Sequence, residues 1–301
     1  MRKVKLIRYF GGKVSMIKDI APYLEAPHSH YVEVFGGGAG ILLNKKPSPC
    51  ETYNDIDNMV VNLFRVVRDP KKFKKFQRLV MLTPYSRTEW IRYCDACKKE
   101  PDEIHRAFQF YYAMNTSFSG RLAAGFSTSV GTTSKHMAGV VASYLTAVEN
   151  LEWIHQRLFR CQIENQDWRI ILDRFDTPGT LFYLDPPYVP STRRSGEYLC
   201  EIPRKDHREL VRILLRIKGK AILSGYDNPI YKRLERNGWK TIEFSKHCLA
   251  SAYGKTRSTR GKVKAMDMFT TNRRTEKLWL SPNLAPGRSR IIGEFLNAEE
   301  K

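Results

Sequence analysis

The sequence predicts an α/β fold in which a mostly parallel sheet carries helices on both faces. Short apolar runs with the length of buried strands recur along the chain. They lie at residues 31–35, 50–54, 160–165, 180–184, 220–224 and 240–244. Helical patterns separate several of these runs, and alternating strands and helices are typical of a parallel sheet covered on both sides.

Two helices are expected among the last three strands. Residues 206–217 form the first, because they place four apolar side chains on one face: Leu210, Val211, Leu214 and Ile217. Asn228 is expected to cap the second, with Pro229 at its first position and Gly238 beyond its end.

The stretch at residues 65–148 lacks strand patterns and predicts a mostly helical insert. Ser86-Arg87-Thr88-Glu89 has the form of a capping box for a helix that ends near Lys99. Pro101 is expected to start another helix that runs to about Asn115. Many of the interleaved aromatic residues must be core, and the basic residues suit a face that binds a polyanion. The predicted parts of the chain are a discontinuous α/β domain, the insert and a C-terminal tail: 1–64 with 149–283, 65–148, and 284–301.

The composition indicates an ordinary globular protein with an unusual charge. Hydrophobic residues make up 42% of the chain and charged residues 27%, but the net charge is +20. Such a surface attracts nucleic acid, although a solvated basic surface is the default interpretation of charge alone. Cys94 and Cys97 have the spacing of half a zinc site that no second Cys/His pair completes, so we expect no metal. No signal peptide or membrane-spanning run is visible, so we expect a cytoplasmic protein without a membrane partner.

The most specific motif is Asp185-Pro186-Pro187-Tyr188, directly after the apolar run 180–184. The prolines end the strand and leave carbonyl groups free, because proline has no N–H for the ladder. The carboxyl ends of strands are where α/β sheets place their sites. A carboxylate and a backbone carbonyl can accept both N–H bonds of an adenine amino group, and the aromatic ring can stack on the base. A strand-terminating turn with a solvated Asp is the alternative, but the full tetrapeptide favours a functional site.

A glycine-rich turn follows the first strand in Tyr31-Val32-Glu33-Val34-Phe35-Gly36-Gly37-Gly38-Ala39-Gly40, and a helix is expected from Ile41. Glycines let a ligand approach the backbone closely. Ile41 stands where a dinucleotide fingerprint has its third glycine. Asn54-Asp55-Ile56-Asp57 follows the second strand, where an acid can bind ribose hydroxyls, although Asp55 alone would suit a helix cap. Together the two motifs predict a nucleoside site.

Two weaker motifs are Arg8-Tyr9-Phe10-Gly11-Gly12-Lys13 and Asn165-Gln166-Asp167-Trp168. Taken in order, all of these motifs together resemble the Dam-like family of DNA adenine-N6 methyltransferases. The resemblance runs from Arg8 to about Asn283. It implies a Rossmann-like methyltransferase sheet with a helical DNA-recognition insert. It also implies S-adenosylmethionine as cofactor and double-stranded DNA as partner, with the target adenine flipped out of the helix.

The resemblance also implies roles for single residues. The catalytic motif is Asp185, Pro186, Pro187 and Tyr188, and Asp185 borders the cofactor as well. The implied cofactor-binding residues are Tyr9, Lys13, Glu33, Phe35, Gly36, Gly37, Gly38, Asp55, Ile56, Asp167 and Trp168. Among them, Tyr9 stands where relatives often have Trp, and Trp168 stands where they usually have Phe.

Residues 115–121 resemble the recognition stretch of the same family, but Leu122-Ala123-Ala124 replaces the Arg-x-Asn that follows in readers of GATC. The recognition sequence therefore stays open. A loop at residues 189–203 is expected to close over the flipped base, and residues 276–280 resemble the closing strand of phage-type relatives. The implied DNA-binding residues are Asn115, Ser117, Phe118, Ser119, Arg121, Arg193 and Arg194.

Other functions stay open at this point. Cytosine-N4 enzymes more often have Ser at the position of Asp185 and protein-amide enzymes have Asn, so Asp185 argues against both, whereas an RNA adenine substrate is less easily dismissed. A nicotinamide-dependent oxidoreductase is suggested only by the glycine turn, and a catalytically inactive DNA-binding relative is the remaining class. A monomer is favoured, and restriction–modification, phage and housekeeping roles are all compatible with the motifs.

Overall fold

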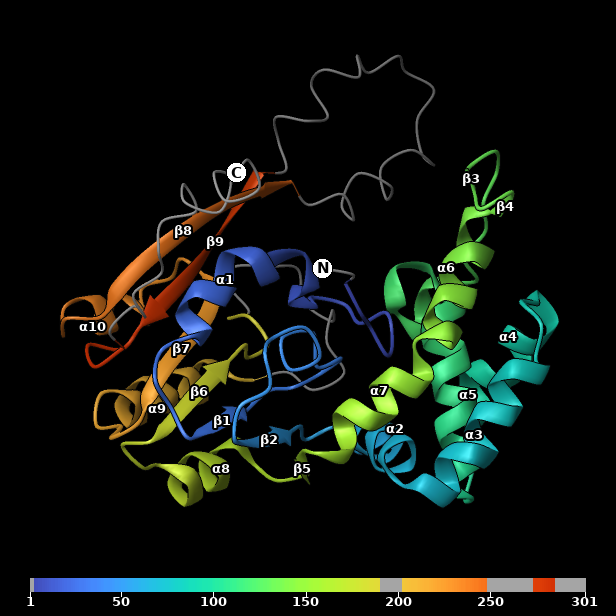
Figure 1. Cartoon of the computed structure of the whole chain (residues 1–301). Helices are drawn as coiled ribbons and strands as arrows, with labels where there is room; N and C mark the ends of the chain where they lie inside the picture. The colour runs from blue at the N-terminus through green and yellow to red at the C-terminus, as the bar shows by residue number, and fades with distance from the viewer. Residues whose placement is uncertain (1–2, 190–201, 248–272, 285–301) are drawn as a thin grey trace, which may run out of the picture. The chain divides into compact units, whose positions relative to one another are not determined.

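The computed structural model describes residues 3–189, 202–247 and 273–284. Seven strands form one sheet in the order β5-β2-β1-β6-β7-β9-β8, and every predicted strand is among them (Figure 1). Their bounds are His30–Glu33 (β1), Cys50–Asn54 (β2), Gln162–Glu164 (β5), Thr180–Leu184 (β6), Lys220–Tyr226 (β7), Lys240–His247 (β8) and Arg273–Leu280 (β9). The predicted α/β class is confirmed, with a mostly parallel sheet.

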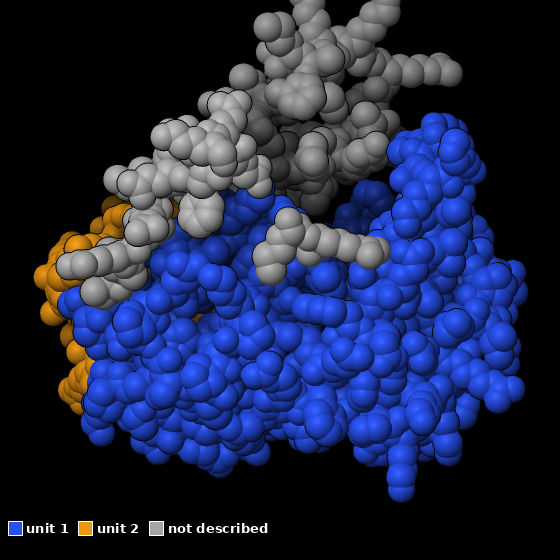
Figure 2. All heavy atoms as spheres, in the orientation of Figure 1, with its two compact units in different colours: residues 1–182, 218–220, 282–301 blue, residues 183–217, 221–281 orange. Residues whose placement is uncertain are grey.

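The chain forms two compact units (Figure 2). Unit 1 contains residues 1–182, 218–220 and 282–301, and unit 2 contains residues 183–217 and 221–281. The predicted helical insert at 65–148 lies wholly within unit 1. The two units are defined by compactness, whereas the predicted domains are drawn from strand and helix patterns, so the predicted domain boundaries remain a prediction.

In unit 1, β1 pairs in parallel with β2, and β2 with β5. A short 3₁₀ turn (η1, Lys13–Met16) and two helices, α1 (Ile17–Leu24) and α8 (Trp168–Phe175), belong to this part of the chain. Six helices precede α8 in the middle of the chain, and three of them lie wholly within residues 65–148, the predicted insert. They are α2 (Asn58–Arg68), α3 (Pro70–Leu82), α4 (Arg87–Ala96), α5 (Glu103–Thr116), α6 (Gly139–Glu149) and α7 (Leu151–Phe159).

Helix α5 is the core of the helical part, because every residue from Ala107 to Thr116 is buried. Helices α3 and α4 lie beside it (Figure 1). Several aromatic residues of this region are core, as predicted: the ring of Tyr112 contacts those of Tyr93, Phe108 and Tyr144.

The two helices predicted around Pro101 exist: the first starts at Arg87, directly after Ser86 as predicted, and the second starts two residues later than predicted. Ser86 precedes α4 without a side-chain cap bond, and its backbone N–H instead donates to the Tyr112 hydroxyl at 2.8 Å. The capping box therefore does not form as predicted, because the tertiary contact takes its place. Helix α5 starts at Glu103, where Asp102 accepts bonds from the backbone N–H groups of the first turn.

No helix follows the glycine turn, so the expectation of a helix from Ile41 is wrong. Residues 37–44 form consecutive turns. Ala39 has a φ of +51°, which a right-handed helix does not accommodate. The N–H of Leu42 donates to the Glu33 carboxylate at 2.8 Å. Helix-type bonds are confined to a single turn here, from the N–H groups of Leu43 and Lys45 to the carbonyls of Ala39 and Ile41 at 3.0 and 2.9 Å.

A buried ion cluster joins β2 to α7. The Glu51 carboxylate lies 2.5 Å from Lys45 Nζ and accepts two bonds from Arg157, one of them from Nη2 at 2.8 Å. All three residues are at most 7% exposed. Arg157 also donates to the carbonyl of Leu42 at 2.9 Å, so the cluster fixes the segment that follows the glycine turn.

In unit 2, β9 lies antiparallel to both β7 and β8. Helix α9 (Arg204–Leu214) matches the amphipathic pattern predicted at 206–217. The second predicted helix is shorter than expected: α10 covers only Lys232–Glu235. Asn228 caps the preceding turn instead, accepting bonds from the N–H groups of Ile230 and Tyr231 at 3.0 and 3.1 Å.

Candidate active site

The glycine turn of unit 1 is fastened to the end of β2. The N–H of Gly36 donates to the carbonyl of Asn54 at 2.8 Å, and the N–H of Gly37 donates to the Asp55 carboxylate at 2.7 Å. The Tyr53 hydroxyl donates to the carbonyl of Gly37 at 2.7 Å. The two predicted nucleoside motifs are therefore in direct contact.

Two glycines of the turn lie so close to aromatic side chains that no larger residue would fit there. Gly37 has a φ of +47°, and a Cβ there would lie 2.8 Å from the ring of Tyr9. A Cβ on Gly36 would lie 2.1 Å from the ring of Tyr53. The glycines thus admit Tyr9 and Tyr53 against the turn, a packing reason that adds to the ligand approach expected from sequence.

Two asparagines that sequence reasoning did not single out hold three loops together. Asn54 donates to the carbonyls of Val34 and Gln166 at 2.9 and 3.1 Å. Asn165 donates to the carbonyl of Asp55 at 2.9 Å. Both belong to predicted motifs. The sequence feature that indicates their role is an asparagine at the carboxyl end of each of two strands, since its short amide can bond the backbone of neighbouring loops.

Asp55 and Asp57 bring carboxyl groups to the end of β2. Desolvation raises the pKa of Asp55 to about 6, although backbone N–H groups of Asp57 and Gly37 lower it. Desolvation also raises the pKa of Asp57. Asp57 caps α2 through one oxygen, and its buried Oδ2 has no hydrogen-bond partner within residues 3–189, 202–247 and 273–284. The site therefore offers acceptors to hydroxyl donors.

Other predicted cofactor residues have packing roles. Glu33 is buried and accepts bonds from the Tyr31 hydroxyl and Leu42 N–H at 3.0 and 2.8 Å. Lys13 is buried and donates to the carbonyl of Gly11 at 3.3 Å. These two side chains stabilise the walls of the site.

An apolar wall lies beside the turn. The rings of Phe35 and Trp168 are 6.3 Å apart between centroids, and the Arg169 guanidinium lies over Trp168 at 4.3 Å. Asp167 caps α8 and pairs with Arg169 at 3.1 Å. Ile56 is 51% exposed, which is high for an apolar side chain and leaves it available to a flat ligand.

Unit 2 carries the Asp-Pro-Pro-Tyr motif immediately after β6. Asp185 is half-buried and Pro186 is buried. Tyr188 is only 7% exposed. Its hydroxyl donates to Glu276 Oε1 at 3.3 Å, and its ring lies 4.3 Å from that of Tyr226. The motif is thus a packed loop with its aromatic ring fixed at two places.

Residues 9–248 match the family described as D12 class N6 adenine-specific DNA methyltransferase. The chain belongs to this family. It is 22% identical over 288 residues to the Type II methyltransferase M1.LlaDCHI of Lactococcus lactis subsp. cremoris, covering 88% of this chain and 94% of the relative. It is 21% identical over 228 residues to the Type II methyltransferase M.CviBI of Paramecium bursaria Chlorella virus NC1A, covering 72% and 81%. Methylation of adenine N6 in DNA, the predicted function, is confirmed.

Part of the methyltransferase's predicted recognition stretch is buried. Asn115 is 3% exposed, and its amide bonds the backbone of Leu6 and Arg8 at 3.1 and 3.2 Å. Ser117 is buried and accepts the indole N–H of Trp90 at 2.8 Å. Both side chains hold the loop that follows them, and their predicted contact with DNA stays a prediction.

The following residues of the methyltransferase are more accessible. Phe118 is 39% exposed, and Ser119 is exposed with a φ of +55°. The Arg121 guanidinium lies 3.6 Å from the ring centroid of Phe10. Arg193 and Arg194 lie outside the described residues, as does most of the loop that was expected to close. Of the stretch 115–121, this tip is the part that can meet a ligand.

Sequence reasoning missed a small hairpin, β3 (Thr133–Ser134) and β4 (Met137–Ala138). Its exposed tip, Lys135 and His136, has φ values of +52° and +58°. Two residues in this conformation make a hairpin turn, but Lys-His is not a pair that sequence signals associate with it.

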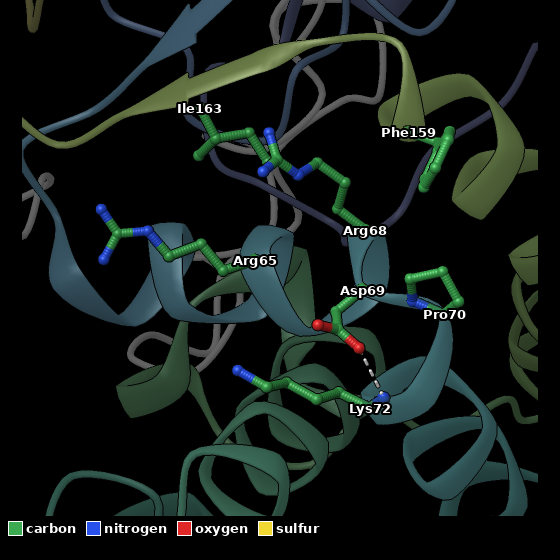
Figure 3. A pocket seen from close by; sticks show the side chains of 7 residues that line it. All are labelled: Arg65, Arg68, Asp69, Pro70, Lys72, Phe159 and Ile163. Atoms are coloured by element: carbon green, nitrogen blue, oxygen red, sulfur yellow. Dashed lines mark hydrogen bonds between the residues drawn. The ribbon is translucent and has the colours of Figure 1, made fainter.

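A basic pocket of about 340 Å³ lies where α2 meets α3 (Figure 3). Two of its cations are engaged: Arg68 donates to the carbonyl of Cys161 at 2.8 Å, and Lys72 lies 2.7 Å from Glu103. No predicted cofactor residue of the methyltransferase lines this pocket, so we do not place the cofactor in it. The lining residues are Arg65, Arg68, Asp69, Pro70, Lys72, Phe159 and Ile163.

Among the described residues, no helix has both the length and the apolar character needed to cross a membrane. No group of three or more metal-ligating His, Cys, Asp or Glu side chains occurs in the same ranges.

Proposed function

We propose that the methyltransferase takes its methyl group from S-adenosylmethionine, held by the glycine turn of unit 1. The donor set supports this cofactor. Asp55 and Asp57 offer carboxyl oxygens to ribose hydroxyls at the end of β2. Phe35 and Trp168 offer an apolar wall to its adenine. When bound, S-adenosylmethionine supplies an electrophilic methyl group on a sulfonium.

Asp185 and the carbonyl of Pro186 are proposed to hold the target amino group. A carboxylate and a carbonyl accept the two N–H bonds of adenine N6, which keeps the nitrogen lone pair out of the ring and directs it outward. Charge develops on this amino group during transfer, so acceptors fixed in place stabilise the transition state. Proline fixes the backbone of the motif. This motif is the single observation that carries the assignment of the catalytic residues.

The proposed substrate is an adenine flipped out of double-stranded DNA, because an amino group inside the duplex is not accessible to such a site. Helix α3 supports a polyanionic partner. Its exposed cations, none of which forms an ion pair within the described residues, are Lys71, Lys74, Lys75 and Arg78. Such groups supply affinity for phosphates without reading sequence.

Two assays together test the cofactor and the substrate. The protein is expressed in a host that lacks DNA methylation, and the host DNA is then sequenced by a method that detects N6-methyladenine. In parallel, the purified protein is incubated with labelled S-adenosylmethionine and either duplex DNA, single-stranded DNA or RNA. We expect label in duplex DNA at one short sequence. Label in RNA alone would contradict the proposal.

The pKa of Asp55 predicts how cofactor affinity depends on pH. A carboxylate accepts from two ribose hydroxyls, whereas a protonated carboxyl loses part of this capacity. Since the pKa of Asp55 without cofactor is raised to about 6, affinity is expected to be full above pH 7. Below pH 6 it should fall by about tenfold per pH unit, as for binding to the ionised form only. Calorimetric titration with S-adenosylmethionine between pH 5 and pH 8 measures this.

Asp55→Asn is the control for the pH profile. It is expected to bind the cofactor more weakly at pH 7.5 and with no pH dependence in this range, while circular dichroism confirms that both proteins stay folded. An affinity of the unaltered protein that is constant from pH 8 to pH 5 would remove Asp55 from the cofactor site.

Phe118 is expected to contact DNA, because its ring is exposed at the tip of the recognition loop. Stacking of a base on an aromatic ring contributes about 1–3 kcal/mol, so Phe118→Ala should weaken DNA binding by roughly 5- to 150-fold. Fluorescence anisotropy with the methylated duplex measures the change. Ile91→Ala is the matched control, since Ile91 is 64% exposed on α4 and is not in the recognition stretch. Equal effects of the two substitutions would speak against a specific role of Phe118.

A further inference from the structure

Two residues on neighbouring strands of unit 2 meet the same tyrosine. In the antiparallel register of β7 and β9, Tyr226 lies directly opposite Glu276. Tyr226 packs its ring on Tyr188 at 4.3 Å between centroids with an interplanar angle of 52°. Glu276 accepts the hydroxyl of Tyr188 at 3.3 Å. One pair of cross-strand neighbours therefore contacts both the face and the hydroxyl end of the same ring.

The neighbour of Glu276 has a different role. Side chains alternate between the two faces of a strand, so Lys277 points away from the face of Glu276. Lys277 Nζ lies 3.0 Å from Asp227 and 3.1 Å from Glu243. Glu276 and Lys277 thus contact different partners from opposite faces of β9.

We propose that Glu276 and Tyr226 are positioning residues for the target adenine, acting through Tyr188. The inference rests on the proposed function, in which the ring of Tyr188 stacks on the flipped base. Glu276 lies beyond residues 9–248, the part of the chain that matches the methyltransferase family, so the family match does not assign it a role.

The physical reason is preorganisation. A tyrosine side chain rotates about two bonds, and fixing it at the moment of binding lowers affinity. Here the backbone of the loop is restrained by Pro186 and Pro187, and the ring is already held by Tyr226 and Glu276. A base that stacks on a ring fixed in advance is aligned more closely, and a displacement of about 1 Å can lower the rate by as much as about 100-fold.

The test is a double-mutant cycle between Tyr188 and Glu276. Tyr188→Phe removes the hydroxyl and keeps the ring, Glu276→Ala removes the acceptor, and Glu276→Gln keeps an acceptor without the charge. Each single substitution to Phe or Ala is expected to lower kcat by about 10- to 100-fold and to leave the KM for S-adenosylmethionine unchanged. The double variant should be no slower than the slower single variant, because both remove the same contact. Glu276→Gln should recover most of the rate.

Stacking of the target base is measured separately, with a duplex in which 2-aminopurine replaces the target adenine that sequencing has identified. In the unaltered protein its fluorescence reports a flipped base, and quenching reports stacking on an aromatic ring. We expect Glu276→Ala to weaken the quenching. Glu243→Ala is the matched control: Glu243 is 59% exposed in its side chain on the adjacent strand β8 and pairs with Lys277. It should behave as the unaltered protein.

The outcomes separate the two proposals. If the unaltered protein methylates adenine in DNA and Tyr188→Ala is inactive, the proposed function stands. If Glu276→Ala then keeps normal kcat and quenching, or if its effect adds fully to that of Tyr188→Phe, the positioning role of Glu276 is refuted. If Glu276→Ala does not fold, as judged by its thermal unfolding, the comparison of Glu276→Gln with Tyr188→Phe decides. If Glu276→Gln unfolds normally but is as slow as Tyr188→Phe, an uncharged acceptor at position 276 does not hold Tyr188, contrary to the expected recovery. If Tyr188→Phe methylates at the normal rate, the bond between Tyr188 and Glu276 has no positioning role.

Discussion

Asp185→Ala is expected to abolish methylation, with kcat at least about 10³-fold lower, the size of effect seen when a preorganised polar partner of the developing charge is removed. The substitution deletes the acceptor for one N–H bond of the target amino group. Binding of S-adenosylmethionine should change little, because the residues proposed to hold its adenosine lie in unit 1, whereas Asp185 follows β6 in unit 2. Single-turnover transfer from labelled cofactor, together with calorimetric titration of the cofactor, measures both quantities.

Asp173→Ala is the matched control for this result, since Asp173 is an exposed acid on α8. It should methylate at the normal rate. Near-normal turnover of Asp185→Ala would show that the Asp-Pro-Pro-Tyr loop does not act on the amino group, and the assignment of catalytic residues would have to be abandoned.

The second large effect concerns stability. Glu51→Ala is expected to lower the free energy of unfolding by about 3–5 kcal/mol, because it leaves Lys45 and Arg157 buried without their counter-charge. Urea unfolding followed by circular dichroism measures this. Activity at low temperature should persist in whatever fraction stays folded, since Glu51 is not among the proposed site residues.

The pH dependence of stability follows from the same cluster. Desolvation raises the pKa of Glu51, but Arg157 and Lys45 outweigh it and hold the net value below the ordinary one. The stabilisation is therefore present above the pKa of the unfolded chain and is lost as the pH falls through the lower folded value. Glu51→Ala should lose less stability on acidification than the unaltered protein.

Glu25→Ala tests whether burial is the cause. Glu25 lies 3.9 Å from Lys46, next to Lys45 in sequence, but its side chain is 52% exposed. Its removal is expected to change the free energy of unfolding by less than about 1 kcal/mol, as for other surface ion pairs. Equal losses from Glu25→Ala and Glu51→Ala would contradict the account of the buried cluster.

Strands were the most predictable part of the fold. The bounds of β2 and β6 agree with the apolar runs at both ends. All five residues of β6 are buried, so hydrophobicity alone marks its extent, and proline ends it. The segment after the glycine turn was mispredicted, because the carbonyl of Leu42, which a continuing helix would bond to the N–H of Lys46, accepts a bond from Arg157 far along the chain. A local pattern does not contain that bond.

The recognition stretch shows the same limit in the site. Its sequence resembles a reading element throughout, yet Asn115 and Ser117 face inward and bond Leu6, Arg8 and Trp90. Which side chains of a polar segment point outward depends on what packs against it. The positive φ values of Ser119 and Gly120 turn the chain there, and Gly120 has no room for a Cβ beside the carbonyl of Arg8.

The sequence by itself determined the α/β class, the nucleoside motifs and the amino-methylating motif, because each depends on residue types in a short and ordered spacing. The tertiary structure decided the raised pKa of Asp55, the packing of Tyr9 on the glycine turn and the contacts of Tyr188 with Tyr226 and Glu276. These depend on burial and on strand register. Both arise only when segments as distant as residues 188 and 276 are brought together, and no local pattern of the chain records that pairing.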